Sequence, residues 1–145
     1  RGLDCRLEIY TDGSLRPWLE RQFRGDPRVT FHGWEADEAY WRRLRTWDVV
    51  AMFSEHEGGP ITLVEAMAAG VLPVYPAITG SVGDDYVPLL HSAAYYPSGD
   101  IPAAAQAVAT LLALPAAERT ALRRRAIELA LPHASSSAAG WPSCG

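Results

Sequence analysis

The 145-residue chain contains no lysine and no asparagine, and all of its basic residues are arginine. It has two cysteines, Cys5 and Cys144, which lie near opposite ends. Two such distant cysteines make neither a disulfide framework nor a metal knuckle, which excludes stapled and zinc-ribbon folds. No apolar run is long enough to cross a bilayer and no secretory signal stands at the start. We therefore expect a cytoplasmic protein without a transmembrane segment.

The charge of the chain gives no sign of a polyanionic partner. Thirteen basic and 17 acidic residues leave a net charge of −4, so we expect no nucleic-acid partner. The hydrophobic fraction of 48% is that of a globular protein with a core. We predict one domain over residues 1–131. Residues 132–145 contain a serine run and lack periodicity, so we predict a loose tail there.

Familiar sets of reactive side chains are also missing. The sequence offers no Ser-His-Asp or Cys-His set, so nucleophilic hydrolysis has no support. His56 lies between two glutamates, but three consecutive residues rarely point at one ion, and we interpret it as a surface-loop residue. The pair Asp84 and Asp85 could hold a divalent cation, although a carboxylate at a helix start is the commoner role. We expect no metal site and no cofactor.

Strand and helix patterns alternate along the chain. Helical periodicity follows the first two predicted strands, with Ser14 and Asp37 as candidate N-caps. The alternation predicts an α/β fold, with a parallel sheet of about five strands and helices on both faces. Ligands bind such sheets beyond the carboxyl ends of the strands. Strands are predicted over residues 6–11, 29–32, 49–53, 71–75 and 93–96.

One stretch, residues 54–70, predicts a strand end, a glycine-containing loop and a helix. Gly58 and Gly59 allow a ligand to approach the backbone closely, and Pro60 suits the first turn of a helix. The helix should end at Gly70. Free N–H groups at its start favour an anion such as a phosphate. Glu57 in the loop is placed to accept hydrogen bonds from sugar hydroxyls.

These residues resemble the signature of the retaining glycosyltransferases of family 4, which have the GT-B fold. The signature is a serine, then E-G-(F/L)-(G/P), then L-E-A-M-A-x-G-x-P-V-V, and the chain has Ser54, E-G-G-P over 57–60 and V-E-A-M-A-A-G-V-L-P-V over 64–74. Glu57 and Glu65 have the E-x7-E spacing of that family. The resemblance covers roughly residues 7–131. It implies the Rossmann-like, donor-binding C-terminal half of a GT-B enzyme that transfers a sugar from a nucleotide-diphospho-sugar with retention.

The resemblance also implies roles for single residues. Glu57, as the catalytic residue, would meet hydroxyls of the donor sugar, and Glu65 would bind the ribose hydroxyls. Gly13 would lie near the phosphates, and Gly33 and Trp34 near the base. The backbone by the sugar and diphosphate would come from Gly58, Gly59, Pro60 and Ile61.

Several parts of the pattern are missing or altered. The acceptor-binding N-terminal domain has no counterpart in the chain, and neither has the lysine that grips the donor diphosphate. Where the family has an aromatic residue or a leucine after Glu-Gly, this chain has Gly59. Where the family has a G-G-x-x-E segment, this chain has G-S-V-G-D over 80–84, with Asp84 in place of the glutamate. The chain is thus expected to be a fragment that transfers no sugar alone. A non-catalytic nucleotide-sugar-binding module and a GT-B-like epimerase stay open as alternatives.

Overall fold

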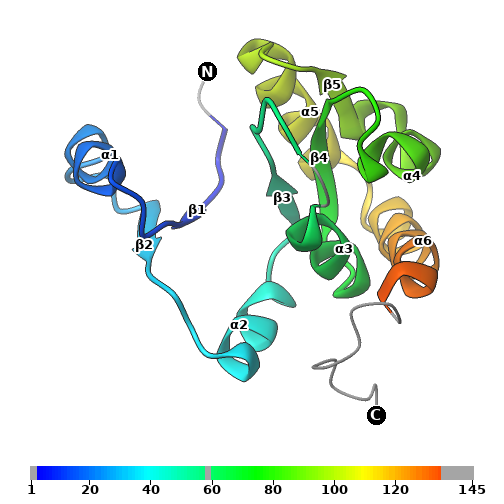
Figure 1. Cartoon of the computed structure of the whole chain (residues 1–145), viewed down its shortest axis with the longest axis horizontal. Coiled ribbons are helices and arrows are strands. Elements are labelled where there is room, and N and C mark those ends of the chain that lie inside the picture. The colour runs from blue at the N-terminus through cyan, green and yellow to red at the C-terminus, as the bar shows by residue number, and fades with distance from the viewer. Residues whose placement is uncertain (1–2, 58–59, 135–145) are drawn as a thin grey trace. The chain divides into compact units, whose positions relative to one another are not determined.

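The structure is a computed structural model that describes residues 3–57 and 60–134 (Figure 1). Strands and helices alternate, as the sequence predicts. In chain order the elements are β1 (Leu7–Tyr10), α1 (Arg16–Gln22), β2 (Val29–His32), α2 (Asp37–Leu44), β3 (Val49–Ala51), α3 (Ile61–Ala68), β4 (Leu72–Ala77), α4 (Val82–Leu90), the 3₁₀ turn η1 (Ser92–Ala94), β5 (Tyr95–Pro97), α5 (Ile101–Ala113) and α6 (Ala116–Ala134).

Contacts divide the chain into two compact units, Arg1–Tyr40 and Trp41–Gly145, and the division falls within α2. We call them the first unit and the second unit. Helix α6 reaches Ala134, and the rest of the predicted tail lies outside the described residues. The assignment of residues 1–131 to one domain stays a prediction.

The first unit is built on two parallel strands joined through α1. Strand β1 pairs with β2 in register, with Leu7 opposite Val29 and Tyr10 opposite His32. Phe23, at the end of α1, packs against Phe31 of β2 with ring centroids 6.3 Å apart. The predicted N-cap at Ser14 is wrong. The N–H of Arg16 donates to the carbonyl of Gly13 at 3.0 Å, so a turn occupies this position and the helix begins two residues later.

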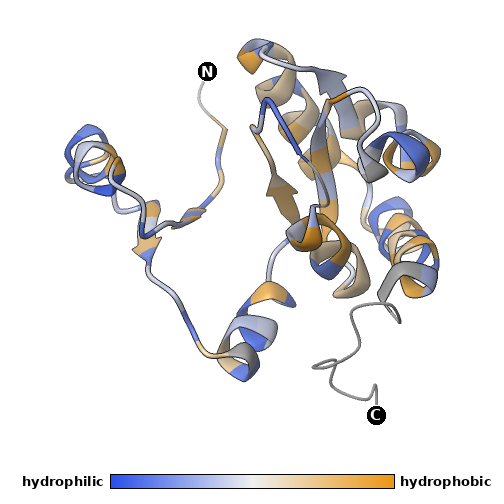
Figure 2. Cartoon of the chain, in the orientation of Figure 1, coloured by the Kyte–Doolittle hydropathy of each residue, from blue (hydrophilic) through white to orange (hydrophobic). Residues whose placement is uncertain are grey.

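The second unit holds a parallel sheet in the order β3-β4-β5, with β4 at its centre. Residues 72–76 of β4 are all buried, and because side chains alternate along a strand, both faces of β4 are covered. Helices α3, α4, α5 and α6 all contact β4. The hydrophobic colour of β3 and β4 in Figure 2 marks this core, whereas α1 of the first unit is mostly hydrophilic.

The α/β class and the parallel direction of all strands are confirmed. Five strands form, but two- and three-stranded sheets divide them, rather than the single sheet that the sequence predicts. Within the described residues, backbone ladders join β1 only to β2, and β3 only to β4.

The helix that follows the Glu57 loop stops just before the predicted glycine, since α3 ends at Ala68 and Ala69 is its C-cap. Gly70 has φ +76°, a left-handed conformation that favours glycine. The N–H of Gly70 donates to the carbonyl of Met67 at 2.9 Å, and that of Val71 to the carbonyl of Ala66 at 2.8 Å. These two bonds form a Schellman motif, which satisfies the last carbonyls of α3 and directs the chain into β4.

No single helix among the described residues combines the length and apolarity of a membrane span. Helices α5 and α6 meet those criteria only as a pair, and the pair is bent by 113°.

Candidate functional site

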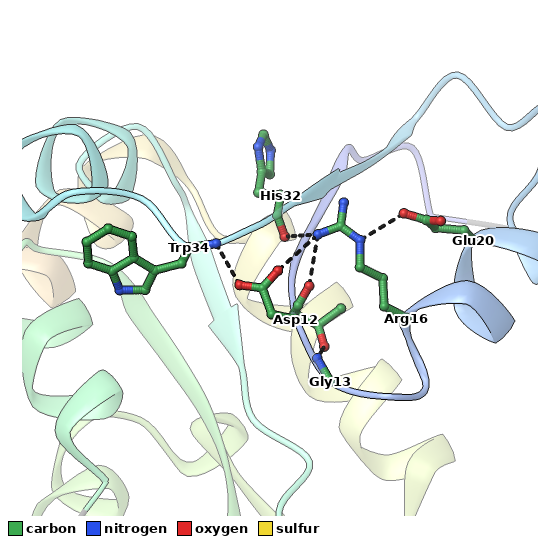
Figure 3. Close-up of polar contacts among 7 residues, drawn as sticks. Asp12, Gly13, Arg16, Glu20, His32 and Trp34 are labelled. Carbon is green, nitrogen blue, oxygen red and sulfur yellow. Dashed lines mark hydrogen bonds and ion pairs between the residues drawn. The ribbon is translucent and has the colours of Figure 1, made fainter.

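In the first unit, the loops that follow β1 and β2 are joined by one carboxylate (Figure 3). Asp12 Oδ2 accepts the backbone N–H of Trp34 at 2.8 Å, and its Oδ1 lies 3.4 Å from Nη1 of Arg16. A carboxylate accepts hydrogen bonds from several donors at once, and bonds to charged groups are the stronger ones. Asp12 therefore links the end of β1 to the end of β2.

Arg16 makes a second connection between the same two strands. Its Nη1 donates to the carbonyl of Thr11 at 3.0 Å and to the carbonyl of His32 at 3.1 Å. Its Nε donates to Oε1 of Glu20, one turn further along α1, at 2.9 Å. The guanidinium thus attaches α1 to the carboxyl ends of both β1 and β2, as the dashed lines in Figure 3 partly show.

Three residues with predicted donor contacts lie in these loops. Gly13 follows β1, and its N–H donates to Oγ1 of Thr11 at 3.2 Å. Gly33 follows β2, and a Cβ added there would lie 3.1 Å from Oδ1 of Asp12, so a larger residue would crowd the carboxylate. The side chain of Trp34 is exposed. The structure brings Gly13, Gly33 and Trp34 together through Asp12 and its neighbours.

Sequence reasoning missed both Asp12 and Arg16. Asp12-Gly13 reads as an ordinary turn, and Arg16 as a residue of an exposed helix. The signal that was available is the acid-base-acid series Asp12, Arg16 and Glu20 at four-residue spacing. Arg16 and Glu20 pair within α1, and Asp12 lies in the loop before that helix.

Aromatic and titratable side chains occupy one face of β1 and β2. The ring of Tyr10 stacks on that of His32, with centroids 4.7 Å apart, and meets Tyr40 edge-on at 6.4 Å. The Tyr10 hydroxyl donates to Glu35 at 3.2 Å, and Nε2 of His32 lies 3.3 Å from Oε2 of Glu8. This layer orders the segment that carries Gly33 and Trp34.

In the second unit, Glu57 lies in the loop after β3, as the sequence predicts. The hydroxyl of Ser54 donates to Oε1 of Glu57 at 2.5 Å. The bond holds the half-buried carboxylate on the short segment that follows β3. Gly58 and Gly59 lie outside the described residues.

Helix α3 follows directly, with Pro60 as its N-cap residue rather than within its first turn. The buried Pro60 contributes its carbonyl, which accepts from the N–H groups of Leu63 and Val64 at 3.0 and 3.3 Å. The N–H groups of Ile61 and Thr62 precede the first helical hydrogen bonds, as at any helix start. Glu65 is half-buried on this helix, one turn after the exposed Ile61.

The β4–α4 connection contains a close packing of Tyr75 against Gly83. A Cβ added at Gly83 would lie 2.3 Å from Cε1 of Tyr75, so only glycine fits. The Tyr75 hydroxyl and Oγ of the buried Ser81 are hydrogen-bonded at 2.5 Å, and Ser81 also accepts the N–H of Gly83 at 3.2 Å as the N-cap of α4. The G-S-V-G-D segment is therefore tied to the central strand.

Acidic residues act on two tyrosines, Tyr75 of β4 and Tyr95 of β5. The hydroxyl of Tyr95 donates to Oδ1 of Asp84. Burial raises the pKa of Tyr75, its hydrogen bond with Ser81 lowers it, and the charges of Glu57 and Asp84 raise it further. Burial, followed by the hydrogen bond to Asp84 and that residue's charge, raises the pKa of Tyr95 to about 12. Glu57 and Asp84 thus act on the same tyrosine, although sequence reasoning identified neither Tyr75 nor Tyr95.

Within residues 3–57 and 60–134, no group of three or more His, Cys, Asp or Glu side chains is arranged to hold a metal ion. The absence of a metal and of a cofactor in the reaction stays a prediction. The predicted site residues therefore form two described groups. Gly13, Gly33 and Trp34 belong to the first unit, and Glu57, Pro60, Ile61 and Glu65 belong to the second.

Comparison with solved structures gives a match to the catalytic domain of cholesterol-alpha-glucosyltransferase from Helicobacter pylori. The match has a TM-score of 0.77 at 16% sequence identity, and it covers 90% of this chain and 80% of that one. At this identity the likeness concerns the fold, which is that of a GT-B glycosyltransferase domain. A search of curated protein sequences gives no match. The sequence profile of the glycosyl transferases group 1 matches residues 1–114, which is most of the chain. The chain therefore belongs to the glycosyl transferases group 1 family.

Proposed function

We propose that the chain is the donor-binding part of a retaining glycosyltransferase that uses a nucleotide-diphospho-sugar. The observation that carries the proposal is the order of β3, the Glu57 loop and α3, with Glu65 on the helix. Glu57 comes before the N-terminus of α3 in the chain, and Glu65 lies on the helix itself. A sugar and a ribose carry hydroxyls that can donate hydrogen bonds to the two carboxylates. A diphosphate carries the negative charge that a helix N-terminus favours.

Glu57 is proposed to bind hydroxyls of the transferred sugar. Because Ser54 donates to Oε1 at 2.5 Å, the carboxylate is restrained before a donor arrives. A carboxylate that is already restrained loses less conformational entropy on binding a ligand than a mobile carboxylate does. Positioning of this kind favours transfer, since the reaction needs the sugar held in one orientation.

The start of α3 is proposed to face the donor diphosphate. The N–H groups of Ile61 and Thr62 and the positive end of the helix dipole favour a negative group there. First-turn carboxylates, which would oppose an anion, are absent from this described helix. The same donors would stabilise the charge that grows on the departing nucleoside diphosphate, which is how this site would lower the barrier.

The other contacts follow from the family resemblance. Glu65 is proposed to accept hydrogen bonds from the two ribose hydroxyls. Gly13 is proposed to lie near the phosphates, with Gly33 and Trp34 near the base. The backbone of Gly58 and Gly59, outside the described residues, is proposed to complete the loop at the sugar. An acceptor-binding domain is proposed to bind the second substrate, the sugar acceptor. The reaction is proposed to need no bound metal.

The alternative is a nucleotide-sugar-binding module without transfer activity. The two candidates share the donor site and differ only in turnover when an acceptor domain is present.

Calorimetric titration tests the shared part. The chain is titrated with UDP, GDP and ADP, and with UDP-glucose, GDP-mannose and ADP-glucose. We expect one base to bind preferentially, both as the diphosphate and as the nucleotide-sugar. Failure of all six ligands to bind at millimolar concentration would contradict the proposal.

A further inference from the structure

We infer that Asp12 is a positioning residue that sets the base preference of the donor site, an inference that rests on the proposed function. The motivating observation is one carboxylate that contacts both loops of the first unit (Figure 3). Oδ2 accepts the Trp34 N–H at 2.8 Å, and Oδ1 faces Arg16 at 3.4 Å. Asp12 needs no contact with the nucleotide to act in this way.

Apart from the Arg16 bonds and the contact between Tyr10 and Glu35, no regular secondary structure defines the shape of these loops. Neither Gly13 nor Gly33–Trp34 belongs to a strand or helix, and Trp34 carries a large side chain that is 82% exposed. The position of that side chain therefore depends on its backbone. The bond from the Trp34 N–H spans 22 residues of sequence, so it fixes the second loop against the first rather than against itself.

Arg16 keeps Asp12 in place. The same Nη1 that faces Asp12 also contacts the carbonyls of Thr11 and His32, the residues at the ends of β1 and β2. Glu20 accepts from Nε and so fixes the orientation of the guanidinium. Because Gly33 has no Cβ, the carboxylate can approach the second loop.

The energies of the Asp12 contacts indicate that this residue positions the second loop and contributes little to the stability of the fold. The side chain of Asp12 is 62% exposed, and exposed ion pairs contribute little to folding because water screens them. A directional hydrogen bond to a backbone N–H nevertheless fixes where the next atoms lie. A shift of the Gly33–Trp34 backbone would change the contacts of a base that binds there.

Asp26 offers a matched control. Its carboxylate likewise accepts a backbone N–H, that of Arg28 at 3.0 Å, and pairs with the Arg28 guanidinium at 2.7 and 2.9 Å. It precedes β2, at the opposite end of the strand from Gly33. Asp26→Ala removes the same kind of contacts from the same unit, but not from the candidate site.

The test measures the Kd values of UDP, GDP and ADP for the wild-type chain and for Asp12→Ala, Asp12→Asn and Asp26→Ala. We expect Asp12→Ala to weaken the preferred nucleotide about tenfold and the others less, so that the ratio of Kd values falls. Asp12→Asn keeps an oxygen acceptor for the Trp34 N–H and should retain most of the preference. Asp26→Ala should bind as the wild type does. A variant that is merely less folded would lose affinity for all three nucleotides equally.

If Asp12→Ala does not fold, Arg16→Gln provides the test, with an expected loss of about threefold in the preferred nucleotide and a lower ratio. If folded Asp12→Ala, or Arg16→Gln, keeps the wild-type ratio of Kd values among the three nucleotides, the inference is overturned and the proposed function stays intact. Equal affinity of the wild type for all three bases would do the same. Absence of any binding by the wild type would overturn both.

Discussion

The two units reach their shapes by different means. Among the described residues of the first unit none is buried, and its loops are joined by hydrogen bonds of Asp12 and Arg16 to backbone groups. The second unit contains the buried core, and its β4–α4 loop is tied through Ser81 to the buried Tyr75. The difference indicates that polar contacts determine loop geometry in the first unit, whereas packing determines stability in the second.

The largest effect is expected from a cavity in the second unit. Leu111 of α5 is 1% exposed within the core, so Leu111→Ala should lower the free energy of unfolding by about 2–5 kcal/mol. Leu7 of β1 is 43% exposed, and Leu7→Ala should change it by less than about 0.5 kcal/mol. Urea unfolding followed by circular dichroism measures both. Similar losses for the two variants would remove the distinction between the units.

A smaller effect is expected from added volume in the same core. Gly83→Ala places a methyl group against the ring of Tyr75, so we expect a loss of about 1–3 kcal/mol from overpacking. At Gly13 an added Cβ would meet only Oγ1 of Thr11, at the ordinary contact distance of 3.5 Å. Gly13→Ala should therefore stay within about 0.5 kcal/mol of the wild type in thermal unfolding. The comparison would be contradicted by a Gly83→Ala variant as stable as the Gly13→Ala variant.

The smallest effect concerns pH. Because the folded chain raises the pKa of Tyr95 to about 12, the neutral hydroxyl is favoured by folding. Its contribution is fully present below the pKa of an unfolded tyrosine, about 10, and is lost as the pH rises toward 12. Absorbance at 295 nm should show a late tyrosine titration, and Tyr95→Phe should remove the share of one tyrosine from it. Asp84→Asn should shift that titration to lower pH, but only in part, because burial is the larger cause. An unchanged titration in Tyr95→Phe would refute the assignment.

The sequence predicts the local features of the site well. Glu57 falls in a loop, Glu65 on a helix and Gly70 at its end because glycine, proline and apolar spacing are signals within a few residues. The Ser14 cap fails because the Gly13 carbonyl, a backbone group, already accepts the N–H of Arg16.

Contacts between distant residues could not be read in the same way. Asp12 meets the Trp34 N–H only once β1 and β2 lie side by side. Tyr75 belongs to a strand that reads as a continuous apolar run, so its hydroxyl gave no sign of its bond to Ser81. The division of five strands between two sheets likewise depends on pairing that periodicity does not specify.

The most direct test of the account compares Glu57→Ala with Glu65→Ala by calorimetry, using the preferred nucleoside diphosphate and its nucleotide-sugar. Each glutamate is expected to contribute a charged hydrogen bond of about 1.5–3 kcal/mol, or roughly ten- to hundredfold in affinity. Glu65→Ala should weaken both ligands, because both contain the ribose. Glu57→Ala should weaken only the nucleotide-sugar, because only that ligand carries the sugar. Equal losses for both ligands in both variants would contradict the assignment of Glu57 to the sugar and Glu65 to the ribose.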